Sequence, residues 1–82
     1  MNDIHLTIVS PERLIFDGNV SQVTLPGEIG EFQVLANHAP LISSLVAGDV
    51  KYTSTETVAL KISSGFVDIN RNQVSVCVEL DG

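Results

Sequence analysis

The strongest constraint on this sequence is an alternation of apolar and polar side chains that repeats every two residues through most of the chain. The clearest run extends from Val74 to Leu80, where every second residue is apolar. Alternate residues of an extended chain point to opposite sides, so such a run predicts a strand with one buried face and one wetter face. Similar runs lie at residues 4–9, 50–53, 58–62 and 67–69, and a further run at 20–25 breaks phase once.

Short groups of turn-forming residues separate these runs. They lie at residues 17–19, 26–27, 47–49, 54–56, 64–65 and 70–72. Gly and Asn tolerate a positive φ, and Asp and Ser side chains bond to the local backbone. Eight or nine short strands at this spacing predict an all-β fold, an antiparallel β-sandwich or flattened barrel in two sheets. At 82 residues the chain, 1–82, makes a single domain.

Two stretches depart from the simple alternation. Val20 and Val23 are out of phase with one another, which a β-bulge between them would explain. In residues 40–47 the apolar side chains recur at i, i+1, i+4 and i+5, a helical spacing that Asn37 could cap. Only two helical turns would fit there, so a helical turn and a kinked strand are equal alternatives.

The charge balance excludes several classes of function. Ten Asp and Glu against four Lys and Arg give a net charge of −6, which cannot provide the basic stripe that nucleic acid requires. No apolar run approaches the roughly 20 residues of a membrane helix, and residues 1–5 lack the cationic start of a signal peptide. Cys77 is the single cysteine, so we expect no intrachain disulfide and a reducing compartment.

Residues for catalysis or cofactor binding are scarce. Cys77 lies in an alternating run with no neighbouring cation, and His5 lies on the polar phase of the first strand. The spacing of His and Cys matches no metal site, and no phosphate loop or serine elbow is present in the sequence. We therefore expect no enzyme activity, no cofactor and no metal.

The segment from Leu25 to Leu41 stands out because it combines glycines, acids and apolar residues in one connection. One interpretation is a β-hairpin whose Ile29 and Phe32 return to the core. The other is a loop that presents Glu28 and Glu31 to a partner with hydrogen-bond donors or positive charge. His38, at the end of this connection, is expected to bond a nearby backbone group.

This segment resembles the motif of the epsilon subunit of F-type ATP synthases, which is called delta in mitochondria. The family reads Gly-x-x-Gly-Glu-(Leu or Phe)-Gly-(Ile or Val)-(Leu or Tyr)-Pro-Gly-His-Ala-Pro-Leu. It is matched at Gly27, Gly30, Glu31, Phe32, Val34, Leu35, His38, Ala39, Pro40 and Leu41. The flanks agree at Leu6, Ile8, Val9, Ser10, Pro11, Glu12, Phe16, Gly18, Val20, Val23 and Leu25, and again across residues 63–69 and 72–76.

Three features depart from the family pattern. Gln33 replaces a glycine, and Ala36-Asn37 replaces Pro-Gly, although Asn37 tolerates left-handed geometry. In the family a pair of helices follows the sandwich, whereas this sequence ends at Gly82. Inhibition of ATP hydrolysis and nucleotide binding by that helical pair are therefore not transferred to these residues.

The resemblance implies a sandwich of about ten strands and a non-catalytic rotor subunit of the central stalk. Its implied partners are the gamma subunit and the c-ring of the membrane sector. A transient contact with the alpha/beta catalytic head is also compatible with the resemblance. The implied location is peripheral, on the cytoplasmic face of a bacterial inner membrane, without direct membrane insertion. Glu28, Glu31 and His38 are the expected c-ring contacts.

The resemblance does not say which sheet face contacts gamma. Apolar residues at strand positions that should face outward are candidates for the gamma contact, and their burial between the two sheets is an equal alternative. These residues are Val9, Ala59, Phe66 and Cys77.

Two alternatives from other classes of protein remain. A lipoyl or biotinyl carrier needs a lysine at an exposed hairpin tip, whereas Lys51 and Lys61 lie within strand patterns. A small ligand-binding sandwich or weak enzyme would use His38 with Glu28 and Glu31.

Overall fold

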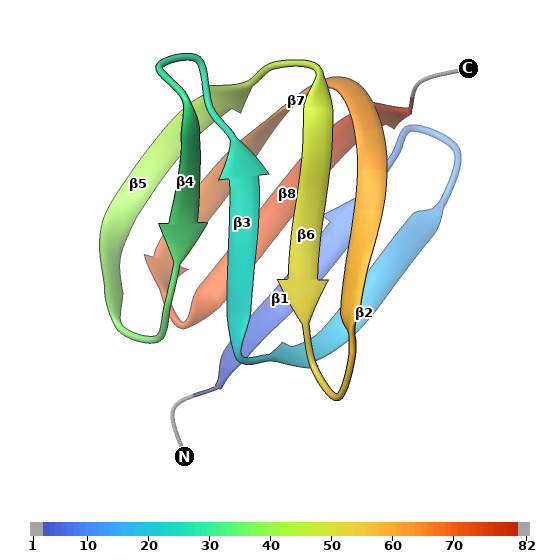
Figure 1. Ribbon diagram of the computed structural model, residues 1–82. Coiled ribbons are helices and arrows are strands. Elements are labelled where there is room, and N and C mark those ends of the chain that lie inside the picture. Colours follow the sequence, from blue (N-terminus) through green and yellow to red (C-terminus); the bar gives the residue numbers. More distant parts are fainter. Residues whose placement is uncertain (1–2, 81–82) are drawn as a thin grey trace.

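The computed structural model describes residues 3–80, and within that range the chain forms eight strands and no helix. The strands are β1 (Ile4–Val9), β2 (Leu14–Val20), β3 (Gln22–Pro26), β4 (Glu31–Val34), β5 (His38–Leu45), β6 (Gly48–Thr53), β7 (Thr57–Arg71) and β8 (Gln73–Leu80). Figure 1 shows two facing layers, with β3, β4 and β6 in front and β1, β2 and β8 behind. The predicted all-β sandwich is confirmed, with a strand count close to that expected.

The pairing order is β2-β1-β8-β7-β6-β3-β4. The remaining strand, β5, pairs with the second half of β7, on the edge opposite to β8. All pairs are antiparallel except β1 with β8. The 15-residue strand β7 belongs to both layers, because Thr57–Ile62 pairs with β6 and Gly65–Arg71 pairs with β5. The two layers are therefore joined through one continuous strand.

Two predicted turns are wrong. Residues 64–65 lie inside β7, where the register with β8 shifts between Ile62 and Ser64 and the strand passes between layers. A Cβ on Gly65 would collide with the carbonyl oxygen of Cys77 and lie 3.2 Å from the Cα of Val78. Gly65 therefore permits the close approach of β7 and β8, and it does not form the turn that the sequence predicts.

Residues 17–19 also form no turn, because they lie inside β2 and pair with β1. The Asp17 side chain accepts hydrogen bonds across the strands, at 2.7 Å from His5 Nε2 and 3.2 Å from Thr7 Oγ1. The chain leaves β2 two residues later, at Ser21, whose N–H donates to the Thr53 carbonyl at 2.7 Å. These polar residues therefore form cross-strand hydrogen bonds on the outer face of the β1–β2 pair and do not form a turn.

The two irregular stretches are also resolved. Val20 ends β2 and Val23 lies in β3, so their phase break marks a change of strand and the predicted bulge is wrong. Residues 38–45 form β5, so the kinked strand is confirmed by a register shift between His38 and Leu41, and the helical turn is wrong. Helical spacing arose because β5 carries apolar side chains on both faces, with Leu45 buried and Ile42 exposed.

The core lies between the layers and is built from the apolar phase of each strand. Its fully buried members include Ile4, Leu6, Ile8, Val20, Val23, Leu25, Val34, Val50, Ile62, Val67, Ile69, Val74 and Val76. Phe16 and Tyr52 add a tilted ring pair with centroids 4.6 Å apart, within the range of favourable aromatic contacts. The period-two prediction of a buried face is confirmed for β1 and β8.

Candidate functional site

The β3–β4 connection is a narrow, well-fixed turn. The N–H of Gly27 donates to the carbonyl of Gly30, and the N–H of Gly30 donates back to Gly27, both at 3.1 Å. Gly30 has φ +143°, where other residues are strained, and a Cβ on Gly27 would lie 2.9 Å from the Phe32 ring. The carbonyl of Pro26 also accepts a hydrogen bond from Val46, which anchors the base of the turn.

We call the two residues that this turn displays, Glu28 and Ile29, the hairpin tip. Both side chains are exposed, and Ile29 is fully accessible at 105% of its reference area. Phe32 turns inward and packs against the core, so the predicted return to the core is confirmed for Phe32 and wrong for Ile29. The tip therefore displays an apolar side chain beside a carboxylate.

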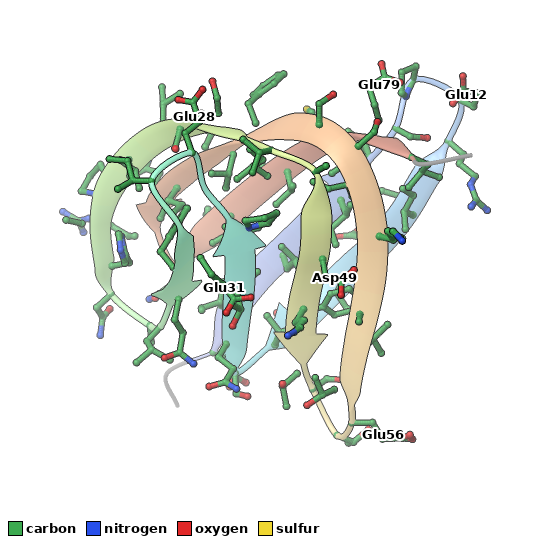
Figure 2. All side chains as sticks on the ribbon, turned by 45° about the horizontal axis from the view of Figure 1, so that its top comes forward. Glu12, Glu28, Glu31, Asp49, Glu56 and Glu79 are labelled. Carbon is green, nitrogen blue, oxygen red and sulfur yellow. The ribbon has the colours of Figure 1, made fainter. Side chains whose placement is uncertain are left out.

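Glu31 comes from the same hairpin but faces a different direction. Figure 2 shows Glu28 at the crest of the turn and Glu31 over the outer surface of the strands. The Glu31 carboxylate lies 3.9 Å from Lys51 Nζ, and both side chains are about half exposed. Exposed pairs of this kind contribute less than about 1 kcal/mol, so the Glu31 carboxylate remains accessible to a partner.

His38 lies at the other end of β4, beyond the β4–β5 turn. Its Nδ1–H donates to the Ala39 carbonyl at 2.7 Å, which confirms that the ring bonds a nearby backbone group. The four residues of β4 span roughly 13 Å at about 3.3 Å per residue. Glu28 and Glu31 thus share one end of the hairpin with a hollow that Leu41 and Ser43 complete, and His38 is not part of it.

The β4–β5 turn is held by a reciprocal pair of asparagines. The Asn37 N–H donates to Asn72 Oδ1 at 2.6 Å, and Asn72 Nδ2 donates to Asn37 Oδ1 at 3.1 Å. Asn37 has φ 65°, the left-handed geometry expected where the family has glycine. Asn72 lies in the β7–β8 turn, so this pair of side chains links the β4–β5 turn to the layer that contains β8.

Replacement of Asn37 tests this link. We expect Asn37→Ala to lower the free energy of unfolding by about 2 kcal/mol, because alanine is strained at this φ and one hydrogen bond is lost. Asn37→Gly should cost less than about 1 kcal/mol, since glycine relieves the strain. Urea unfolding monitored by circular dichroism measures both, and equal losses would contradict the left-handed strain.

A second surface lies on the outer face of the layer that contains β1 and β8. Val9 is paired with Cys77, Cys77 with Phe66, and Val9 also with Leu14, so these residues follow one another across four strands. Phe66 and Leu14 are 53% and 58% exposed. We call Leu14, Val9, Cys77 and Phe66 the apolar row.

Three members of the apolar row, Val9, Cys77 and Phe66, line a groove together with Ser10, Pro11, Val78 and Glu79. Figure 2 shows Glu12 near Glu79 at this end of the sandwich. Three of the four outer-phase candidates therefore meet on one face, and Ala59 lies apart, paired with Lys51. Leu14 was missed because Leu14, Ile15 and Phe16 are consecutive apolar residues, which carry no period.

Other chemistry is sparse over the described range. No group of three or more His, Cys, Asp or Glu within residues 3–80 could hold a metal ion. The same range contains no helix long and apolar enough to cross a membrane. Lys51 and Lys61 lie within β6 and β7, so neither is at a hairpin tip as a swinging-arm carrier would need.

Comparison with known proteins gives a consistent result. The model for the family "ATP synthase, Delta/Epsilon chain, beta-sandwich domain" matches residues 3–80. The ATP synthase epsilon chain of Campylobacter fetus is 46% identical over 81 residues, which cover 96% of this chain and 63% of that protein. The epsilon chain of Caulobacter vibrioides is 38% identical over 80 residues, covering 96% and 93%.

Solved structures share the fold. The mitochondrial ATP synthase of Euglena gracilis, described with OSCP, F1 and c-ring, contains a chain with TM-score 0.88 and 24% identity over 95% of this chain and 51% of its own length. The central stalk and c-ring of the Tetrahymena thermophila enzyme contain one with TM-score 0.79 and 19% identity, covering 93% and 63%. The chain spans 63% of the Campylobacter and Nitratiruptor epsilon chains that it matches.

Proposed function

This chain belongs to the ATP synthase delta/epsilon β-sandwich family, and on this premise we propose that it is a rotor subunit of the central stalk. In this role it joins the gamma subunit to the c-ring and helps to couple proton flow to ATP synthesis, without making or breaking bonds itself. It sits peripherally on the cytoplasmic face of a bacterial inner membrane as part of the complex.

The observation that carries this proposal is the presence of two different surfaces on opposite layers of the sandwich. The hairpin tip belongs to the β3–β4 layer, and the apolar row crosses β2, β1, β8 and β7 of the other. A subunit that joins two partners needs two such surfaces. A dense core and a strand shared between the layers also support a part that must carry load.

The chemistry of each surface favours one partner. Glu28 and Glu31 are accessible carboxylates, which suit the polar loops of the c-ring and set the docking position more than the affinity. The apolar row resembles the core of a lasting interface, and Glu79 at its rim suits a basic residue. We therefore assign the tip and Glu31 to the c-ring and the apolar row to gamma.

The single cysteine makes the gamma assignment directly testable. Cys77 is partly exposed within the apolar row, so a maleimide should label it in the free chain. In a one-to-one complex with gamma, isolated by size-exclusion chromatography, we expect the labelling rate to fall at least about tenfold, because core residues of an interface are excluded from solvent.

The matched control moves the thiol to the other layer. Ala59→Cys in a Cys77→Ser background should label at the same rate with and without gamma. Equal labelling of Cys77 in the free and bound chain would contradict the assigned face while leaving the rotor role intact. Failure of the chain to elute with well-folded gamma would contradict the rotor role itself.

A further inference from the structure

We infer that Ile29 is the apolar anchor of the c-ring contact, an inference that rests on the proposed function. Ile29 is the most exposed large hydrophobic residue among residues 3–80, at 105% of its reference area, and Ile42 follows at 75%. Isoleucine is among the residue types most often fully buried in folded proteins. Ile29 does not stand alone, because it lines one hollow with Phe32 and with Leu41, which is 38% exposed, and a contiguous exposed apolar patch marks an interaction site.

The turn itself does not require isoleucine. Neither Glu28 nor Ile29 has a positive φ, so the two central positions of this turn accept most residue types. The flanking glycines already provide the geometry, through the paired Gly27–Gly30 hydrogen bonds at 3.1 Å. Ile29 also contributes nothing to the core, which Phe32 of the same hairpin contacts instead.

The tip is prepared for binding because its backbone is fixed on both sides. The Pro26 carbonyl accepts the Val46 N–H at 2.9 Å, and Gly27 bridges to Leu45 of β5. A fixed turn loses little backbone conformational entropy when its tip docks, which lowers the cost of binding. Side chains that fill well-packed pockets near the centre of an interface carry most of its binding energy.

The surroundings of Ile29 define the partner surface. Glu28 stands beside it, and the hollow next to it is lined by Phe32, Leu41 and Ser43. The complementary surface is an apolar depression bordered by a hydrogen-bond donor or a positive charge. We assign this depression to the space between neighbouring loops of the c-ring, since the adjacent Glu28 and Glu31 are proposed to contact the same loops.

Affinity for the c-ring tests the anchor. The 82-residue chain in complex with gamma is bound to c-rings in lipid nanodiscs, and Kd is measured by biolayer interferometry. We expect Ile29→Asn to raise Kd about tenfold and Ile29→Leu to stay within about threefold, because leucine restores most of the buried apolar area. Leu35→Asn, a half-exposed apolar residue at the opposite end of β4, should stay within about twofold of wild type.

The other possible results each contradict either the Ile29 anchor or the c-ring contact. An unchanged Kd for Ile29→Asn, alongside a loss for Glu28→Lys, would overturn the anchor and leave the c-ring contact standing. Equal losses for Ile29→Asn and Leu35→Asn would show unspecific apolar adhesion, and equal binding to empty nanodiscs would show that the tip senses lipid; either overturns the anchor. Absence of wild-type binding to the ring would overturn the proposed c-ring contact on which the anchor rests.

Discussion

Gly65→Ala is expected to lower the free energy of unfolding by about 3 kcal/mol, because an added methyl group has no space between β7 and β8. Its Cβ would meet the Cys77 carbonyl and the Val78 Cα, which are backbone atoms and cannot rotate away. Overpacking that forces a backbone shift costs about 1–3 kcal/mol and sometimes more. Thermal unfolding should show a midpoint lower by roughly 12–24 °C for a domain of this size.

Gly18→Ala is the matched control, since this glycine is also inside a strand. There the nearest atom is Phe16 Cζ at 3.2 Å, the far end of a side chain that can move. We expect a loss of at most about 1 kcal/mol. If Gly65→Ala were no worse than Gly18→Ala, the close approach of β7 and β8 at this point would be wrong.

Leu25→Ala is expected to cost about 3 kcal/mol of unfolding free energy, because Leu25 is completely buried between the layers. The cost combines the lost transfer free energy with the cavity left behind, and deletions of this kind typically cost 2–5 kcal/mol. Small domains have total stabilities of about 5–15 kcal/mol, so this single change removes a large share. Urea unfolding monitored by circular dichroism gives the value.

Ile29→Ala is the comparison for Leu25→Ala, in the same hairpin and four positions later. Because Ile29 is fully exposed, its truncation should change stability by less than about 0.5 kcal/mol. A loss similar to that of Leu25→Ala would mean that Ile29 packs into the fold, and it would also remove the basis for the proposed anchor. The two variants together distinguish the stability contribution of a buried side chain from that of an exposed one within the same hairpin.

Much of the fold could be predicted from residue pattern alone. The alternation in Val74–Leu80 predicts β8, and the turn residues at 54–56 and 70–72 lie at the ends of β7, where Arg71 takes φ 58°. These features depend on local geometry, since the pleat sets which side chains share a face. The motif around Gly27 and Gly30 likewise predicts the turn that displays Glu28.

The candidate site was only partly predictable. Glu28 and Glu31 do lie at one end of a hairpin, but His38 follows β4 to its other end, because the strand separates residues that the motif places close together in sequence. The apolar row could be suspected residue by residue for Val9, Phe66 and Cys77. Its continuity depends on the pairing of β8 with β7 and, above all, of β1 with β8, which places Val9 beside Cys77, 68 positions away in the sequence.

The sequence by itself determined that this chain forms short strands with one apolar face, and where most of its reversals occur. These properties depend on backbone geometry over a few residues. Only the tertiary structure decided that Gly65 lies inside a strand shared by both layers, that Leu14 extends the apolar row, and that Ile29 remains exposed whereas Phe32 is covered. Burial depends on which distant strand lies opposite, and that is set by the pairing of the whole sheet.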